Sequence, residues 1–361
     1  MANIFPSTRI RRTHFSDGVE KAGVKGYTVY NHMLLPTNFG NLQDECIHLK
    51  NYVQIWDVAV ERQVSVTGKD TEKLLNLISP RDLSKMSDDQ CFYIPVIDRN
   101  GGMLNDPVLI KINKDKYWFS LADSDFLQYL LGISDALNLD VKIEEPDISP
   151  LAIQGPKSDE LMSRVFGKDV TSIKFFRYKK LYYKGYEMIV SRSGFSKQGG
   201  FEIYVEGSEY AMNLWNTFLE YGSDLNIKVG CPNLIETIES GLLSYGNDIT
   251  RENTPFEAGL GKFVNSTRDY IGKKNLLSRP INKMIKPISI HGKIPISDRA
   301  WKIFDKDKEI GLISRATYSM SYETNVAIGM ISKSHWDPGT KIEVLTHEGM
   351  RKAVVEKNFW N

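Results

Sequence analysis

The C-terminal part of the chain carries the pattern that most restricts its fold. From Pro287 to Phe359, short apolar runs alternate with polar turns, and no stretch has the period of an amphipathic helix. Closely spaced short strands of this kind are typical of a small barrel or sandwich. We therefore predict an all-β domain over residues 280–361, with its boundary near Pro280. The expected strands lie at residues 288–290, 300–303, 311–314, 326–330, 341–345 and 352–356.

The rest of the chain contains strands and helices in an order that occurs twice. Each half has a strand and a helix, then a meander of strands, then a second helix. We predict an α+β fold, with domains at residues 1–145 and 146–279. The first half has expected strands at 62–68, 92–97, 103–112 and 116–121, and helices at 70–78 and 125–139. The second has expected strands at 149–153, 180–183, 187–191 and 201–205, and helices at 157–166, 209–221 and 233–243.

Charge, cysteine content and missing motifs exclude several classes of function. The 46 Lys and Arg nearly balance 45 Asp and Glu, so we expect neither a nucleic-acid partner nor binding to an anionic membrane. No apolar run reaches the roughly 18 residues of a membrane span. The N-terminus lacks a signal-peptide core, and three isolated cysteines fit a reducing cytoplasm. The histidines lack metal-ligand spacing, and GxSxG, P-loop and GxGxxG motifs are absent. We expect no metal, and an enzyme of this kind would depend on a bound organic partner and on positioning.

One carboxylate interrupts a strongly apolar stretch. The sequence DRNGG at 98–102 predicts a hairpin turn, and Asp106 follows it, directly before Pro107. A buried carboxylate needs hydrogen-bond donors or a cavity around it. Asp106 therefore either stabilises a turn before proline or faces a cavity, and these residues leave both interpretations open.

A glycine-rich loop at residues 193–200 leads into the strand that carries Glu202 and Tyr204. Side chains two apart on a strand share a face, so a carboxylate and a phenol lie together. Because a carboxylate accepts two parallel hydrogen bonds, the pair suits a flat heterocycle with amidine-like N–H donors. An ordinary hairpin with one exposed face is the alternative.

Motifs along nearly the whole chain resemble those of the glycine-cleavage T-protein family of folate-dependent aminomethyltransferases. They occur in the family's order, and Glu239 precedes YGND as it does in the family. The motifs are QIWDV at 54–58, VTGKD at 66–70, LAIQGPKS at 151–158, GGFEIY at 199–204, YGND at 245–248, TPFEAGL at 254–260, DYIG at 269–272, EIG at 309–311 and GTKI at 339–342.

Other motifs are similar to those of a branch of this family that demethylates the sulfonium dimethylsulfoniopropionate. They are YTVYNHMLLP at 27–36, WFSLADSD at 118–125, SKQGG at 196–200 and KSHWD at 333–337. Asn233 and Thr237 stand where aminomethyltransferases carry arginines, and Ala122 stands where they carry Asn. These departures agree with the branch, whereas Phe195 stands where the branch has Trp.

The resemblance implies a three-domain cloverleaf of the aminomethyltransferase type, with two α+β units and a C-terminal β-barrel around a central tetrahydrofolate channel. It implies that Glu202 binds the pterin edge with Tyr204 and Tyr93 beside it, and that Asp106 lies near the reactive folate nitrogen. Candidate substrate contacts are Tyr30, Trp56, Ser120, Phe195 and Lys197. Aromatic faces among them would hold the sulfonium. Lys197 would pair with the substrate carboxylate, or is a solvated surface lysine.

The function that the resemblance implies is methyl transfer from dimethylsulfoniopropionate to N5 of tetrahydrofolate. Its products are 3-methylthiopropanoate and 5-methyltetrahydrofolate. The alternatives are a folate-dependent demethylase of another small methylated cation, an aminomethyltransferase and a folate-binding module without turnover. The sequence leaves a monomer and a homodimer open.

Overall fold

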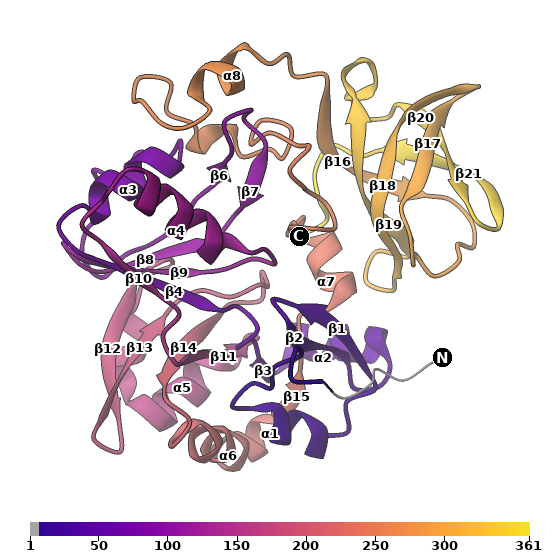
Figure 1. The fold of residues 1–361 in the computed structure, drawn as a ribbon. Helices are drawn as coiled ribbons and strands as arrows, with labels where there is room; N and C mark the ends of the chain where they lie inside the picture. The colour runs from indigo at the N-terminus through magenta and orange to yellow at the C-terminus, as the bar shows by residue number, and fades with distance from the viewer. Residues whose placement is uncertain (1–6) are drawn as a thin grey trace. The chain divides into compact units, whose positions relative to one another are not determined.

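A computed structural model describes residues 7–361, which form two compact units (Figure 1). Of the described residues, unit 1 comprises 7–71, 86–92 and 108–233, and unit 2 comprises 72–85, 93–107 and 234–361. Both units mix helices with strands, so the predicted α+β class is confirmed. The division into domains at 145 and 279 stays a prediction. Within residues 7–361, every helix is too short or too polar to cross a lipid bilayer.

Unit 1 is built on two sheets. The six-stranded sheet has the order β12-β13-β14-β11-β3-β15, and the five-stranded sheet has the order β10-β4-β9-β8-β5. The strands of the first are β3 (Gln54–Asp57), β11 (Ile148–Gln154), β12 (Tyr178–Tyr183), β13 (Tyr186–Ser191), β14 (Gly200–Glu206) and β15 (Lys228–Gly230). Those of the second are β4 (Gln63–Thr67), β5 (Cys91–Tyr93), β8 (Val108–Asn113), β9 (Lys116–Ser120) and β10 (Lys142–Glu144).

The alternation of side chains along β14 separates two cores in unit 1. Phe201, Ile203 and Val205 pack against helices, in a core that includes Trp215 and Phe218. Tyr204 points to the other face and packs with Trp118 and Ile110 of the five-stranded sheet. The helices of unit 1 are α1 (Ser16–Lys21), α2 (Leu42–Asn51), α4 (Phe126–Ala136), α5 (Ser158–Phe166) and α6 (Ala211–Tyr221), and a hairpin of β1 (Gly26–Tyr30) and β2 (Met33–Asn38) completes it.

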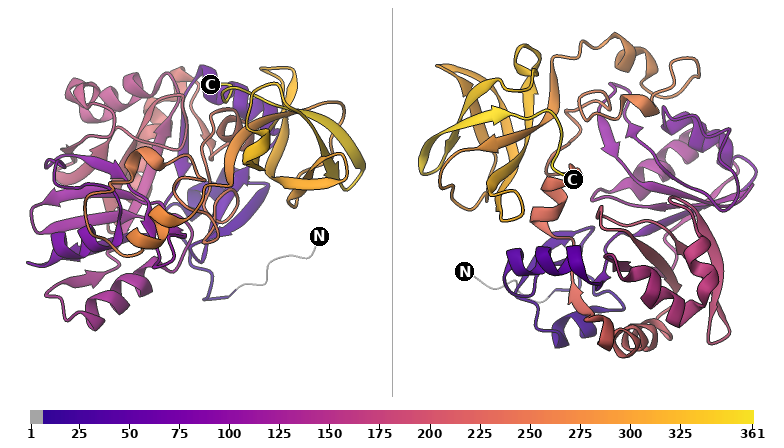
Figure 2. Two further views of the ribbon diagram at one scale, coloured as in Figure 1. Left: turned by 90° about the horizontal axis from the view of Figure 1, so that it is seen from above. Right: turned by 180° about the vertical axis from the view of Figure 1, so that it is seen from behind.

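Unit 2 contains a closed six-stranded barrel, drawn in orange and yellow in Figures 1 and 2. Its order is β16-β19-β18-β17-β20-β21, and alternate side chains such as Trp301 and Ile303 fill its interior. The strands are β16 (Lys283–Ile290), β17 (Trp301–Asp305), β18 (Lys308–Ser319), β19 (Thr324–Ser332), β20 (Lys341–Thr346) and β21 (Gly349–Val355). The predicted all-β C-terminal region is therefore confirmed as a barrel. Helices α3 (Thr71–Ile78), α7 (Leu234–Glu239) and α8 (Lys273–Ser278) and the hairpin of β6 (Val96–Ile97) and β7 (Met103–Asn105) complete the unit.

Three predicted elements differ from the observed ones. The strand expected at 103–112 is divided into β7 and β8 at Asp106-Pro107, since proline has no N–H for a strand ladder. The strand expected at 92–97 is interrupted at Pro95 for the same reason. The helix expected at 233–243 ends at Glu239, two residues before Gly241, which has a φ of 64°.

Candidate functional site

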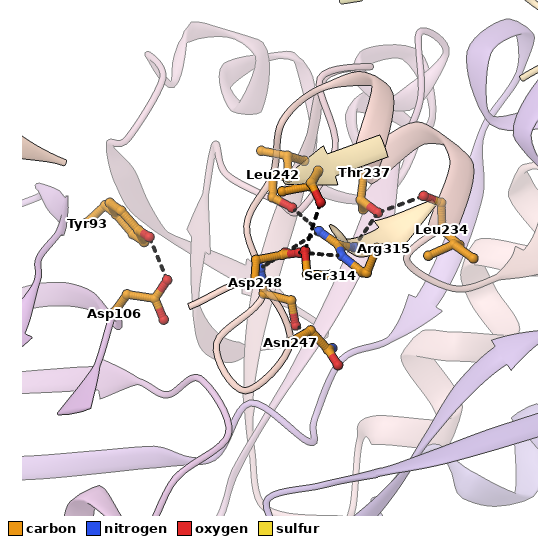
Figure 3. Close-up of polar contacts among 11 residues, drawn as sticks. Tyr93, Asp106, Leu234, Thr237, Leu242, Asn247, Asp248, Ser314 and Arg315 are labelled. Carbon is orange, nitrogen blue, oxygen red and sulfur yellow. Dashed lines mark hydrogen bonds and ion pairs between the residues drawn. The ribbon is translucent and has the colours of Figure 1, made fainter. Parts of the chain in front are cut away.

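Asp106 of unit 2 is a buried carboxylate at the end of β7. It follows the hairpin predicted at 98–102, in which β6 and β7 pair. The Tyr93 hydroxyl donates a hydrogen bond to its Oδ2 at 2.6 Å (Figure 3). Its Oδ1 is buried and has no hydrogen-bond partner among residues 7–361. A buried acceptor without a partner is rare in proteins and requires an explanation, and a bound ligand is one.

The environment of Asp106 raises the pKa of its carboxyl group to about 7. Burial raises the pKa of this carboxyl from 3.8 to about 7, the Tyr93 hydrogen bond opposes the rise, and the Asp248 carboxylate adds to it. A carboxyl with such a pKa exists in both protonation states near pH 7. It can therefore accept a proton from a reacting group and release it again.

Aromatic and cationic side chains surround Tyr93 within unit 2. Its ring meets the Phe263 ring edge-on, with 6.0 Å between centroids. The Arg81 guanidinium lies 4.5 Å from the Phe263 centroid and donates a hydrogen bond to the Tyr93 carbonyl at 2.5 Å. The Lys262 ammonium lies 5.0 Å from the same ring centroid. These contacts fix the ring of Tyr93, and thereby its hydroxyl against Asp106.

A buried ion pair connects the barrel to the YGND segment of unit 2. Arg315 of β18 donates to the Asp248 carboxylate at 2.5 Å, and both side chains are nearly inaccessible (Figure 3). The same guanidinium donates to the Thr237 hydroxyl at 3.1 Å and to the Leu242 carbonyl at 2.7 Å. Because every one of these partners belongs to the framework of unit 2, we assign this cluster a structural role.

Glu202 and Tyr204 of unit 1 lie on the same face of β14, as the alternation predicted. The Ser193 hydroxyl donates a short hydrogen bond to Glu202 Oε2, and the Tyr204 hydroxyl lies 3.5 Å from the same oxygen. The Ser191 and Ser193 hydroxyls are 2.5 Å apart. Burial raises the pKa of the Glu202 carboxyl, while the Ser193 and Tyr204 hydroxyls oppose the rise.

The glycines of the 193–200 loop allow a close approach to a side chain of the protein itself. Gly194 and Gly200 both have a φ of 150°, and a Cβ on either would lie within 2.5 Å of the Gln154 amide. That amide donates to the Ser193 carbonyl at 3.1 Å and accepts from the Ser196 hydroxyl at 2.8 Å. Gln154 thus fixes the loop beside Glu202.

Ser120 of β9 lies on the face that meets the six-stranded sheet. Its hydroxyl donates to Glu61 Oε2 at 3.1 Å and accepts from the Gln63 amide at 2.9 Å. Burial raises the pKa of the Tyr204 phenol most strongly, and Glu202, Cys91 and Glu61 add to the rise in that order. The structure thus brings Ser120 to the region of Tyr204, within unit 1.

The other predicted substrate contacts have different environments. Tyr30 ends β1, and the adjacent Asn31 fixes this tip: its backbone N–H donates to the Asp123 carboxylate at 2.8 Å and its side chain to the Val60 carbonyl at 3.0 Å. In the 193–200 loop, Phe195 is half-buried and Lys197 is exposed.

Trp56 is the predicted contact whose position argues against its role. Its side chain has no exposed surface, packs in the core with Leu49, Val58 and Ala152, and donates its indole N–H to Gln54 at 2.8 Å. A ring enclosed in this way presents no face to a cation, so we leave Trp56 out of the site proposed below.

Sequence reasoning missed the polar side chains that hold these residues in place. Ser193 belongs to the quoted loop, and its contact with Glu202 has no sequence signal of its own. Gln63 carries a weak signal, since it lies in the strand predicted at 62–68, which alternates polar and apolar residues, and Glu61 directly precedes that strand. Within residues 7–361, no group of three His, Cys, Asp or Glu side chains is arranged to hold a metal ion.

Comparisons with known proteins agree on one family. The model of the GCVT N-terminal domain matches residues 15–268, and that of the glycine cleavage T-protein C-terminal barrel domain matches residues 288–360. Dimethylsulfoniopropionate demethylase DmdA of Ruegeria pomeroyi is 59% identical over 363 residues and all of both chains. An aminomethyltransferase of Caldanaerobacter subterraneus is 30% identical over 90% of each. The crystal structure of aminomethyltransferase T from Bartonella henselae superposes with a TM-score of 0.86 over 98% of each chain, at 19% identity.

Proposed function

This chain belongs to the glycine cleavage T-protein family, and we propose that it is a tetrahydrofolate-dependent demethylase of dimethylsulfoniopropionate. The observation that carries the proposal is the 59% identity to the Ruegeria pomeroyi demethylase along the whole chain, compared with 30% to the aminomethyltransferase named above. The products would be 3-methylthiopropanoate and 5-methyltetrahydrofolate.

The polar groups of the protein fit a reduced folate. A pterin edge presents parallel N–H donors, and Glu202 is a buried carboxylate whose position Ser193 fixes. Asp106 Oδ1 is a buried acceptor that lacks a donor. Bound tetrahydrofolate supplies a nucleophilic secondary amine, N5, whose proton must leave once the methyl group has been accepted. We propose that Glu202 holds the pterin edge, with Tyr204 and Tyr93 as further folate contacts.

A sulfonium methyl donor requires little chemical assistance from the protein. As the C–S bond breaks, its electron pair stays on sulfur and gives a neutral thioether, so the leaving group needs no general acid. The protein must align donor and acceptor and exclude water. Positioning of this kind contributes roughly 7–11 kcal/mol to rate acceleration.

Asp106 would act on the proton that N5 loses as the N–CH3 bond forms. Its Oδ1 accepts that proton, while Tyr93 remains hydrogen-bonded to Oδ2. Release to water then returns the carboxylate. Because the pKa of Asp106 is about 7, both steps are accessible near neutral pH.

The sulfonium itself would be held by aromatic faces. We propose Tyr30 and Phe195 for this role, at roughly 0.5–2 kcal/mol each. Lys197 and Ser120 remain our candidates for the polar end of the substrate, where Lys197 would neutralise the carboxylate.

A turnover assay with purified protein tests the proposal. Dimethylsulfoniopropionate and tetrahydrofolate should yield equimolar 3-methylthiopropanoate and 5-methyltetrahydrofolate. Turnover of another methylated cation in preference would change the substrate, and folate binding without turnover would support a binding module. Asp106→Ala should abolish turnover while folate still binds, and Glu202→Ala should weaken folate binding more than sulfonium binding. Unchanged turnover in the first variant, or the opposite ranking in the second, would overturn these assignments.

We also propose a cytoplasmic location, because the side chains of Cys46, Cys91 and Cys231 are buried and form no disulfide within residues 7–361, as suits a reducing compartment. The proposed partners are the two small substrates, without nucleic acid. Size-exclusion chromatography with light scattering separates a monomer from the homodimer that the sequence leaves open.

A further inference from the structure

The inner face of β9 carries three side chains that can donate hydrogen bonds. Lys116, Trp118 and Ser120 alternate along the strand and pair with Thr67, Ser65 and Gln63 of β4, so they share one face. This face packs toward the six-stranded sheet, where the Trp118 ring lies 6.3 Å from the Tyr204 ring. All these residues belong to unit 1.

The indole N–H of Trp118 is buried without a hydrogen-bond partner among residues 7–361. Such a donor costs about 1–3 kcal/mol when it stays unsatisfied, and buried donors in proteins almost always meet an acceptor from the protein, water or a ligand. The indoles of Trp56 and Trp336 follow that rule, since they donate to Gln54 and to the Ile331 carbonyl, both at 2.8 Å, whereas the Trp301 indole in the barrel core is a second exception. Trp118 is therefore a donor whose acceptor is missing.

The surroundings of Trp118 favour an anionic acceptor. The Lys116 ammonium lies 5.6 Å from the Trp118 ring centroid, and no carboxylate in the described part of the chain forms an ion pair with it. The Ser120 hydroxyl already donates to Glu61. An oxygen anion above this face would thus find its hydrogen-bond donor in Trp118 and, in Lys116, a positive charge additional to the one that we propose for Lys197.

We propose that Trp118 binds the carboxylate of the methyl donor by donating its indole N–H to it. This inference rests on the proposed function and adds a specificity-determining residue to it. It explains how the protein would distinguish a carboxylate-bearing sulfonium from one with only alkyl groups. Tetrahydrofolate also carries carboxylates, so the test measures both substrates.

The variant Trp118→Phe removes the N–H and keeps an aromatic ring. Loss of a hydrogen bond to a charged acceptor should raise the KM for dimethylsulfoniopropionate roughly 10- to 100-fold. Neither kcat nor the KM for tetrahydrofolate should change more than about twofold. With trimethylsulfonium, which has no carboxylate, variant and parent should perform alike.

Trp301→Phe is the matched control. Trp301 fills the barrel core at 2% exposure, and its indole N–H is likewise buried without a partner in the described chain. This variant removes the same group from a similar environment in unit 2, so it should leave the KM of both substrates unchanged. Thermal melting of both variants shows whether each is folded.

Two measurements together separate this inference from the proposed function: the turnover assay, and calorimetric titration with dimethylsulfoniopropionate, which measures binding whether or not turnover occurs. A parent protein that turns over, with a Trp118→Phe variant of unchanged KM, overturns the inference and leaves the function standing. A parent protein that binds dimethylsulfoniopropionate without turnover overturns the proposed function. In that case the dissociation constant of the Trp118→Phe variant still tests the role of Trp118. A raised KM for folate instead would assign the indole to the folate, against our proposal. A parent that neither binds nor reacts overturns both.

Discussion

Replacing Asp106 by asparagine should stabilise the protein at alkaline pH while abolishing turnover. In the folded protein this carboxyl is buried, and its pKa is raised from 3.8 to about 7. Between these two pH values the folded state binds a proton that the unfolded state has released. Stability therefore falls as pH rises through this window, and the full cost is present above pH 7. The asparagine side chain would carry no charge and would still accept the hydrogen bond from Tyr93.

The size of the effect follows from the pKa change. A tenfold change in a dissociation constant corresponds to about 1.36 kcal/mol, so the rise from 3.8 to about 7 amounts to about 4 kcal/mol at most. Part of that cost is already present at pH 5. Between pH 5 and pH 8, the stability advantage of Asp106→Asn over the parent should therefore grow by about 2–3 kcal/mol.

Urea unfolding of both proteins across this pH range measures the difference. Comparing variant with parent cancels other titrating groups, such as Asp57, whose pKa burial raises to about 6. Asp106→Glu is the control that keeps the charge, so its stability difference from the parent should vary much less with pH. An Asp106→Asn advantage that stays constant from pH 5 to pH 8 would refute the reasoning.

Three further predictions concern neighbouring contacts. Tyr93→Phe removes the hydrogen bond that lowers the pKa of Asp106, so the acidic limb of the kcat/KM profile should move to higher pH; an unmoved limb contradicts this role. Arg315→Met leaves Asp248 buried without its cation and should cost about 3–5 kcal/mol in unfolding free energy, and an unchanged melting temperature would contradict the structural role. Phe195→Trp should lower the KM for dimethylsulfoniopropionate about two- to fivefold, because indole attracts cations more strongly than benzene; a higher KM would exclude Phe195 from cation binding.

Sequence patterns correctly predicted the strands and turns that depend only on residues adjacent in the chain. Alternation alone placed Glu202 and Tyr204 on one face of β14, because successive strand residues point to opposite sides of a sheet. The turn at 98–102 and the short C-terminal strands were also predictable from the sequence, because glycine and polar residues terminate apolar runs. Prolines were the weak point, because an apolar run such as 103–112 predicts a strand whose ladder Pro107 interrupts.

The long-range contacts of the site and of the framework around it cannot be predicted from local patterns. Ser120 and Glu61 are 59 residues apart, and Arg315 and Asp248 are 67 apart, so no period in the sequence relates them. Burial is equally hard to infer for one residue. Trp56 and Trp118 are both aromatic residues within quoted family motifs, and only tertiary packing makes the first a satisfied core residue and leaves the second an unpaired donor.

The fate of an isotope-labelled methyl group tests the central claim most directly. Purified protein is incubated without oxygen with tetrahydrofolate and dimethylsulfoniopropionate that carries CD3 groups on sulfur. Direct transfer predicts 5-methyltetrahydrofolate that retains all three deuterium atoms, formed in step with labelled 3-methylthiopropanoate. Folate that remains unlabelled while the sulfonium is consumed, or that gains a methylene group with fewer deuterium atoms, would contradict the account.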